Sequence, residues 1–354
     1  GGMLGASVLS IGYPLASKAL NPIELERVYG SMPSRNVLIT GANSGIGRAA
    51  VEILSKNGHN VYVVCRTLDK AEATITEIKT SLGDRITGTL TPMECDVSDL
   101  ESVRKFARDF RASGAPLNVL VANAGISLNA NYKGDEQVLR SKDGFELTVA
   151  TNYFGHFLLV NMLLPTLEKS GSDSRVVITG SEVHDPTSAG GSVGPGATLG
   201  DLRGLESKAA MVDGGVYDAN KAYKDSKLLD IMFALELQRR LKSEGSTISV
   251  NSFGPGLITK SGFFRNQNSF FSSLFDFAAS DLFHVTETVE FGGSCIAYMA
   301  LSKDLDGKGG LWFNAVEPGR PKFEQLQPST EARDTAKARE LYDKTMKLVG
   351  LQVM

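Results

Sequence analysis

The chain has 354 residues, a 42% hydrophobic fraction and a formal net charge of −3, with 37 Lys and Arg against 40 Asp and Glu. These values allow one large α/β domain or two average domains, and they disfavour a general nucleic-acid binder. Three widely spaced cysteines (Cys65, Cys95, Cys295) predict reduced thiols rather than disulfides, and four histidines without metal-ligand spacing predict no structural metal.

The first 17 residues form an uncharged, apolar stretch that Pro14 and several Gly and Ser residues interrupt. The stretch is close to the minimum length of a membrane span, but its composition favours an apolar arm that lies on the protein or on a membrane surface. It lacks the basic region of a secretory signal. Asn21 and Pro22 then predict the start of a short helix through Tyr29, so we separate residues 1–35 from the domain that follows.

A glycine-rich turn follows the first predicted strand, residues 37–40. Strand, glycine turn and helix are the context of a dinucleotide-binding motif, because glycine lets backbone N–H groups approach a pyrophosphate and the helix directs its positive end toward it. The candidate cofactor-binding residues of this turn are Gly41, Asn43, Ser44, Gly45, Ile46 and Gly47.

The second predicted strand, residues 61–65, ends at Arg66. NAD-binding folds usually have an acid at this position for the ribose 2′-hydroxyl. A cation there, with Lys70 one turn later, suits a 2′-phosphate instead, so the pattern favours NADP over NAD. The alternative is that Arg66 only ends a strand at the surface.

The next two predicted strands cover residues 88–95 and 117–121. Asp96 and Val97 follow the first of them, at a position suited to the adenine ring. Ser98 and Glu101 have the spacing of a capping box that opens a helix. Asn123, Ala124 and Gly125 follow the second strand, where small residues let the backbone approach a ribose.

A long helical pattern, residues 144–167, carries Asn152 in an otherwise apolar face. A buried Asn often satisfies backbone groups, so a structural role is the alternative to a functional one. A fifth strand, residues 175–179, leads to Ser181. A sixth strand, residues 247–253, leads to Pro255 and Gly256. A last strand at residues 310–313 and a C-terminal helix at residues 329–349 complete the predicted elements.

This alternation of strands and helices predicts an α/β fold with a doubly wound parallel sheet of the Rossmann type, with ligands at the carboxyl ends of the strands. Tyr223 and Lys227 lie four residues apart on a helix that runs to about residue 242, so they share one face. A nearby ammonium lowers the pKa of a phenol, as a proton donor for a carbonyl, an alcohol or a polarised double bond requires. The spacing alone is common on amphipathic helices.

Six motifs in chain order resemble those of the short-chain dehydrogenase/reductase superfamily: Thr40-Gly41-x-x-x-Gly45-x-Gly47, Asn123-Ala124-Gly125, Asn152, Ser181, Tyr223-x-x-x-Lys227 and Pro255-Gly256. The resemblance implies that Tyr223 is the general acid and that Lys227 lowers its pKa and holds the nicotinamide ribose. It also implies that Ser181 orients the substrate and that Asn152 supports a proton relay. We assign Pro255, Gly256 and Ile258 to the cofactor site as well.

Ser181 and Tyr223 lie 42 residues apart, whereas ordinary members of the superfamily have about a dozen. The insertion, residues 182–216, resembles one branch, the light-dependent protochlorophyllide oxidoreductases of oxygenic phototrophs. Residues 143–147, 151–159, 337–339 and 347–351 add to this likeness, which covers residues 36–351. Enzymes of that family reduce the C17–C18 double bond of a chlorophyll precursor with NADPH, using light that the pigment absorbs.

Two positions depart from the branch: Leu257 stands where the family has a cysteine in the pigment pocket, and Lys260 stands where it has a threonine. A phenylalanine-rich segment within residues 257–284 includes Phe263 and Phe264, which we assign to the substrate pocket with Leu257. In the family this region forms a lid over the pigment and can meet the membrane. Ordinary core packing against the sheet is the alternative.

The resemblance therefore implies NADPH-dependent, light-dependent reduction of protochlorophyllide to chlorophyllide in chlorophyll biosynthesis. It implies a plastid protein of the stroma or the thylakoid surface, with peripheral membrane contact and a photosynthetic complex or a homo-oligomer as assembly. Two alternatives stay open. One is a divergent short-chain reductase with another substrate, which Leu257 and Lys260 favour. The other is a non-catalytic subunit that binds NADPH and pigment in a membrane complex. We expect residues 36–354 to form the cofactor-binding domain.

Overall fold

The computed structural model describes residues 18–19, 32–128, 131–171, 173–258, 286–317 and 322–352. Four expectations lie outside these residues: the apolar arm at residues 1–17, the helix at residues 21–29, Lys260, and the aromatic segment with Phe263 and Phe264.

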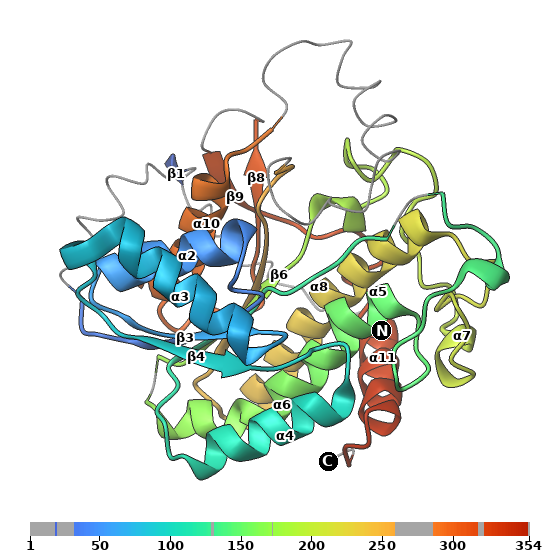
Figure 1. Cartoon of the computed structure of the whole chain (residues 1–354). Helices are drawn as coiled ribbons and strands as arrows, with labels where there is room; N and C mark the ends of the chain where they lie inside the picture. Colours follow the sequence, from blue (N-terminus) through green and yellow to red (C-terminus); the bar gives the residue numbers. More distant parts are fainter. Residues whose placement is uncertain are drawn as a thin grey trace, which may run out of the picture.

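Within the described residues, one nine-stranded sheet with the order β1-β9-β8-β7-β6-β5-β2-β3-β4 forms the centre of the molecule (Figure 1). The seven strands from β4 to β8 in this order run parallel. At the β8 edge, β9 pairs antiparallel with β8, and β1 pairs antiparallel with β9. The strand order reverses between β2 and β5, which is the switch point where doubly wound folds bind ligands. The predicted fold class is confirmed. The strands are β1 (Lys18–Ala19), β2 (Asn36–Thr40), β3 (Asn60–Cys65), β4 (Leu90–Glu94), β5 (Val119–Ala122), β6 (Arg175–Thr179), β7 (Ser249–Gly254), β8 (Trp312–Val316) and β9 (Lys322–Leu326).

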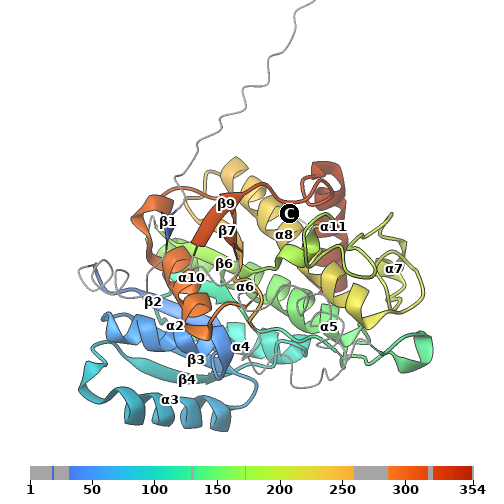
Figure 2. The ribbon, with the colours of Figure 1, turned by 90° about the horizontal axis from the view of Figure 1, so that it is seen from above.

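Helices cover both faces of the sheet, so the central strands are buried on both sides (Figures 1 and 2). This double burial explains why β5 and β7 are buried at every residue and read as unbroken apolar or small-residue runs. One face packs against α4 (Leu100–Ala112), α6 (Gly155–Lys169), α8 (Ala219–Ser243) and α11 (Thr335–Leu348). The other face packs against α2 (Gly45–Lys56), α3 (Leu68–Leu82) and α10 (Val289–Leu301).

Several local predictions differ from the structure. The capping box at Ser98 is wrong: Asp99 is the N-cap of α4 and accepts from the N–H groups of Glu101 (3.0 Å) and Ser102 (3.3 Å). The Ser98 hydroxyl donates to Asp96 instead. The helix predicted at residues 144–167 is divided into α5 (Leu147–Val149), the π-helical turn η3 (Ala150–Phe154) and α6.

Among the described helices, the stretch Leu147–Lys169 is long and apolar enough to cross a membrane by length and composition alone. Of its most apolar window, 78% is buried inside the molecule. The stretch packs against α4 and contributes Phe157, Leu159 and Leu163 to the core. Its apolar character is that of a core helix.

The insertion at residues 182–216 contains two short helical elements, η4 (Glu182–His184) and α7 (Arg203–Glu206). α8 holds it through Lys224, whose ammonium donates to the carbonyls of Gly191 (2.9 Å) and Val193 (2.5 Å). The C-terminal region also holds it, since the Leu199 N–H donates to the Glu331 carboxylate at 2.9 Å. The insertion is therefore packed as part of the same domain.

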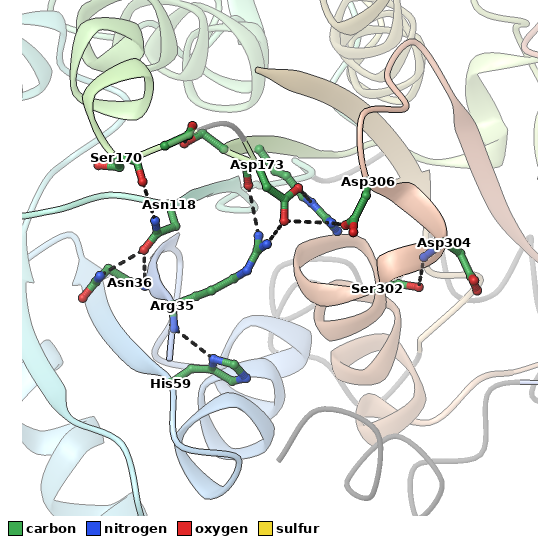
Figure 3. A network of polar contacts seen from close by, with 12 residues as sticks. Arg35, Asn36, His59, Asn118, Ser170, Asp173, Ser302, Asp304 and Asp306 are labelled. Carbon is green, nitrogen blue, oxygen red and sulfur yellow. Dashed lines mark hydrogen bonds and ion pairs between the residues drawn. The ribbon is translucent and has the colours of Figure 1, made fainter. Parts of the chain in front are cut away.

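At the amino ends of the strands, an ion network forms around the buried Arg175 (Figure 3). Arg175, the first residue of β6, has a side chain that is only 1% exposed. Its guanidinium pairs with Asp173 (3.1 Å) and Asp306 (2.5 Å) and donates to the Met299 carbonyl (3.3 Å). Arg35, just before β2, pairs with Asp173 as well.

Amide side chains continue this network across the starts of β2 and β5 (Figure 3). The Asn118 side-chain oxygen accepts from the backbone N–H of Asn36 (2.9 Å) and from its side-chain amide (3.0 Å). The Asn118 amide donates to the Ser170 carbonyl at 3.1 Å. Strands far apart in sequence are thus tied together at this end by groups that bond to one another.

Candidate active site

A cavity of about 700 Å³ opens at the carboxyl ends of the strands. The ion network lies at the other end of the same strands. It brings together every predicted site residue in the described chain except Asn152. The predicted residues that line it are Gly41, Asn43, Ser44, Gly45, Ile46, Gly47, Arg66, Lys70, Asp96, Val97, Asn123, Ala124, Gly125, Ser181, Tyr223, Lys227, Pro255, Gly256, Leu257 and Ile258.

The glycine turn after β2 forms one wall of the cavity. Gly45 starts α2 with a φ of 56°, which favours glycine, and a Cβ at Gly47 would lie 2.6 Å from both the Asn123 amide nitrogen and the Gly41 oxygen. Among the described residues, Ser44 makes no side-chain cap bond and the first turn of α2 carries no acid. The N–H groups that begin α2 therefore remain available, and they fit a pyrophosphate.

Two cations lie on the outer rim of the cavity, after β3. The Arg66 side chain is 62% exposed, and its Nε lies 4.0 Å from an Asp96 carboxylate oxygen. Lys70 is exposed on the first turn of α3. The other Asp96 oxygen accepts from the Ser98 N–H (2.9 Å) and hydroxyl (2.7 Å), which fixes that carboxylate. An exposed arginine and lysine at this rim fit a phosphate on a ribose.

Thr40 and His156 are hydrogen-bonded to each other behind the glycine turn and join the ends of β2 and β5 to η3. The Thr40 hydroxyl oxygen accepts from the N–H groups of Asn123 (2.9 Å) and Ala124 (3.0 Å), which joins the ends of β2 and β5. His156 Nδ1 lies 2.8 Å from the Asn152 carbonyl, so it donates there, and Nε2 accepts from the Thr40 hydroxyl at 2.9 Å. Burial lowers the pKa of His156 to about 4, so the imidazole is neutral. Sequence reasoning missed this residue, whose only signal was a histidine within an apolar helix.

Asn152 is not among the described residues that line the cavity, and it is 1% exposed. Its side-chain oxygen accepts from the Ile126 N–H (2.8 Å), and its amide donates to the Ile126 carbonyl (3.0 Å) and the Ser226 hydroxyl (2.9 Å). These bonds fix the cavity wall at Ile126 and the part of α8 beside Tyr223. The relay role that the resemblance implies for Asn152 stays a prediction.

Tyr223 and Lys227 face the cavity from α8. The Tyr223 hydroxyl is hydrogen-bonded to Ser181. The Lys227 ammonium donates to the Thr179 carbonyl and to the Asp230 carboxylate, both at 2.9 Å. Burial raises the pKa of Tyr223 and outweighs the opposing effects of Lys227 and Ser181. Lys227 thus lowers this pKa as predicted, but burial has the larger and opposite effect, so the phenol is protonated at neutral pH, as a proton donor must be.

His184 holds Ser181 from behind. Its Nδ1 lies 2.8 Å from the Ser181 carbonyl and donates to it, while Nε2 accepts from the Ser329 N–H at 3.1 Å. The ring also meets Trp312 edge-on, with centroids 4.9 Å apart. Burial lowers the pKa of His184, so this histidine too is a neutral cross-link. No local pattern indicates its contact with Ser329, because that contact joins residues 145 positions apart.

Apolar side chains and a carboxyl group that were not predicted also line the cavity. Leu139, Leu147 and Val183 supply apolar surface, and Glu182, directly after Ser181, supplies the carboxyl. Burial raises the pKa of Glu182 against the effect of a hydrogen bond from the Gly190 backbone. Sequence reasoning missed Glu182, although its position next to Ser181 was a usable signal.

In the part of the chain that the structure describes, no group of three or more His, Cys, Asp or Glu side chains is arranged to hold a metal ion. The three cysteines are buried free thiols. Burial raises the pKa of Cys65 to about 11 and that of Cys95 to about 12, which makes them poor nucleophiles at neutral pH.

Comparison with known proteins agrees with this geometry. The family model for short chain dehydrogenases matches residues 35–193. Protochlorophyllide reductase of Cucumis sativus is 36% identical over 89% of this chain and 78% of its own length. The enzyme of the same name from Chlamydomonas reinhardtii is 33% identical over 96% of this chain and 83% of its own length.

Solved structures share the fold. An uncharacterized protein from Mycobacterium paratuberculosis superimposes with a TM-score of 0.65 and 28% identity, over 92% of this chain and 97% of that one. L-sorbose reductase from Gluconobacter frateurii, solved with NADPH and L-sorbose, gives a TM-score of 0.58 and 17% identity, over 83% of this chain and 98% of that one.

The sheet order, the family match and the meeting of glycine turn and Tyr-Lys pair in one cavity define a short-chain dehydrogenase/reductase, an oxidoreductase that uses a nicotinamide cofactor. The relatives at 33% and 36% identity narrow the assignment. The chain belongs to the protochlorophyllide reductase family, as a divergent member.

Proposed function

We propose that this protein reduces the C17–C18 double bond of protochlorophyllide with NADPH, under light, to give chlorophyllide. The observation that carries the proposal is a neutral, Ser181-bound Tyr223 in the same cavity as a glycine turn and a cationic rim. Protochlorophyllide reductases at 36% identity support the choice of substrate.

The chain's own residues suit NADPH. The N–H groups that begin α2 bind the pyrophosphate, and Arg66 with Lys70 binds the 2′-phosphate. Asp96 and Val97 border the adenine, while residues 123–125 and 255–258 border the riboses and the nicotinamide. NADPH, when bound, supplies the hydride.

The remaining hydrogen comes from the protein. Tyr223 gives its hydroxyl proton to the carbon that does not receive the hydride, and Ser181 holds that hydroxyl in place. Lys227 holds the nicotinamide ribose. Leu257, with Leu139 and Leu147, offers hydrocarbon surface to a flat apolar macrocycle. Because Leu257 replaces the family's cysteine, no thiol positions the pigment from that point of the cavity.

The proposal extends to location. The relatives from Cucumis sativus and Chlamydomonas reinhardtii are chloroplastic, so we assign the protein to the plastid, in the stroma or at the thylakoid surface. Peripheral membrane contact, and assembly as a homo-oligomer or within a photosynthetic complex, belong to the same proposal.

A flash experiment tests the reaction. Pure protein receives NADPH and protochlorophyllide in the dark, and chlorophyllide absorbance is followed after a light flash. We expect product from the wild type and a loss of about 100-fold or more in rate for Tyr223→Phe. Tyr217→Phe is the matched control, because Tyr217 is buried and bonds to Glu146 outside the cavity lining. Equal product from Tyr223→Phe and wild type would overturn the assignment of the acid.

Cofactor choice has its own test. Arg66→Ala should weaken NADPH binding at least tenfold and leave NADH binding within about twofold, because the side chain meets only the 2′-phosphate. Fluorescence titration of both cofactors measures this. Equal weakening of NADPH and NADH would remove the 2′-phosphate assignment.

A second candidate is a short-chain reductase with a different substrate. Glu182 and Leu257 favour it, because a carboxyl group and a branched hydrocarbon that replaces the family's cysteine change which substrates the cavity accepts. NADPH oxidation in the dark with a panel of carbonyl substrates separates the two reactions. NADPH binding without turnover of any pigment, together with co-purification in a photosynthetic complex, would instead favour the non-catalytic subunit.

A further inference from the structure

A buried carboxylate lies directly behind the Tyr-Lys pair. Tyr223, Lys227 and Asp230 are spaced four and three residues apart on α8, so they follow one face of the helix. The Lys227 and Asp230 side chains are 5% and 3% exposed, and Nζ lies 2.9 Å from the Asp230 carboxylate. Tyr223 and Lys227 line the cavity, whereas Asp230 is not among its described lining residues. Asp230 therefore touches no ligand in the cavity itself: it acts by its contact with Lys227 and by the effect of its charge on Tyr223.

The bonds of Lys227 define what Asp230 does to it. An ammonium has three N–H donors. In the described structure one goes to the Thr179 carbonyl and one to Asp230, each at 2.9 Å, which leaves the third for a ligand in the cavity. The two fixed bonds hold the ammonium in one orientation, because they come from different elements, β6 and α8.

The charge of Asp230 matters as much as its geometry. A cation beside a phenol stabilises the phenolate, and a carboxylate beside that cation offsets the effect. The titratable groups around Asp230 are Lys227 and Tyr223 on α8, Tyr153 on η3, and His156 on α6, which faces Lys227. Tyr153 is protonated and bonds to Thr345, and His156 is neutral, so neither replaces the carboxylate. Burial raises the pKa of Asp230 to about 6, and this carboxyl group is therefore mostly ionised at neutral pH.

The same helix carries a second buried Asp-Lys pair with a different purpose. Asp225 and Lys221 are 2.6 Å apart, and the Asp225 carboxylate also accepts from the Thr198 N–H in the insertion at 3.0 Å. Lys221 is not among the described residues that line the cavity. The two pairs have the same chemistry. The Asp225–Lys221 pair holds the insertion, whereas the Asp230–Lys227 pair lies beside Tyr223, the proposed proton donor.

We propose that Asp230 is a positioning residue that fixes Lys227 and offsets its charge, and so keeps Tyr223 as a neutral phenol ready to donate a proton. The site is thereby set for reduction rather than for the reverse oxidation, in which the tyrosine must begin as phenolate. This inference deepens the proposed function and rests on Tyr223 being its acid.

The test follows the ionisation of Tyr223 itself. Tyrosinate absorbance is titrated with pH in the wild type, Asp230→Asn and Asp225→Asn, and the same titration with Tyr223→Phe added is subtracted from each. We expect Asp230→Asn to move the Tyr223 midpoint down by at least one pH unit, a tenfold increase in phenolate. Asp225→Asn should leave that midpoint in place. An unchanged midpoint in Asp230→Asn, or an equal shift in both variants, would overturn the proposal.

A second pair of variants keeps the proposal testable if Asp230→Asn folds poorly. In a Lys227→Met background there is no ammonium to position, so only the direct charge effect of Asp230 on Tyr223 remains, and adding Asp230→Asn should lower the Tyr223 midpoint by less than it does when Lys227 is present. An equal shift in both backgrounds would mean that Asp230 acts independently of Lys227, which would overturn its role as a positioning residue. These titrations need no substrate. A shifted midpoint without chlorophyllide formation would therefore overturn the proposed substrate and leave the role of Asp230 intact.

Discussion

The two ends of the parallel strands use the same type of side chain in opposite ways. At the amino ends, Arg175 is 1% exposed, and its guanidinium bonds to Asp173, Asp306 and the Met299 carbonyl. At the carboxyl ends, Arg66 is 62% exposed, with one carboxylate at 4.0 Å. Arg175 uses its hydrogen-bond donors on groups of the chain, whereas Arg66 leaves its donors exposed, where a ligand could accept from them.

This difference extends beyond the arginines. Asn118 at the amino end bonds to both amide groups of Asn36, whereas Ser44 at the other end makes no cap bond to a described residue. Unused donors near a cavity lower stability in exchange for binding. The comparison indicates that side chains at the amino ends of the strands bond mainly to the chain itself, whereas those at the carboxyl ends leave donors exposed at the cavity where we propose that the cofactor binds.

The largest expected effect comes from Arg175→Met. The change removes a buried guanidinium and leaves the Met299 carbonyl without it, so we expect a loss of about 3 kcal/mol in the free energy of unfolding. Urea unfolding measures it. Arg66→Ala is the matched control and should change stability by less than about 0.5 kcal/mol. Similar losses of unfolding free energy from Arg175→Met and Arg66→Ala would contradict the difference between the two ends of the strands.

Gly47→Ala should weaken the open end of the sheet. The added Cβ would lie 2.6 Å from the Asn123 amide nitrogen and the Gly41 oxygen, so the turn must shift. We expect a cost of about 1–3 kcal/mol in stability and at least a tenfold loss of NADPH affinity. Urea unfolding and fluorescence titration measure the two effects.

Gly83→Ala separates stability from binding. Gly83 ends α3 with a φ of 54°, and no described atom lies within 4 Å of an added Cβ. The substitution should cost about 1 kcal/mol through backbone strain and leave NADPH affinity unchanged. If Gly83→Ala weakened NADPH as much as Gly47→Ala, the binding loss would reflect general instability.

The last expected effect is a pH dependence of stability at His156. The folded pKa is about 4 against 6.5 for a free histidine, so between these values the unfolded chain binds the extra proton. Stability from this group therefore rises with pH across that window, by up to about 1.4 kcal/mol per pH unit.

The raised pKa values of Asp225 (about 7) and Asp230 (about 6) oppose this slope, because there the folded state holds the extra proton. The contribution of His156 is therefore the difference between wild type and His156→Gln, measured by urea unfolding at pH 5 and pH 7. The wild type should gain more stability than the variant between these pH values. Equal gains would show that His156 is not buried as a neutral group.

Local motifs predicted the parts of the fold and the site that local physics determines. β6 was predicted at its observed bounds, because a short apolar run rich in β-branched residues between turn signals favours a buried strand. The glycine turn and Arg66 were predicted to share a site, since carboxyl ends of neighbouring parallel strands meet at one edge. α10 was missed because it is buried on all sides and shows no amphipathic period.

The residues that support the site could not be read from the sequence. Asp230 looks like any charge on a helix until Lys227 is found 2.9 Å away in a buried environment. His184 depends on Ser329, which lies after β9, a strand that no local pattern predicted. The lowering of the Tyr223 pKa by Lys227 was predicted, but the larger, opposite effect of burial was not, because burial is a property of the packed molecule.

The bond between His184 and Ser329 sets an order in time. Ser181 takes its orientation from His184, whose other ring nitrogen is held by a residue made 145 positions later. At roughly 5–20 residues per second on the ribosome, this delay is roughly 7–30 s. The strands that carry the glycine turn and the cationic rim emerge well before the groups that hold Ser181. The contact that supports Ser181 through His184 therefore cannot be complete until Ser329 has been synthesised.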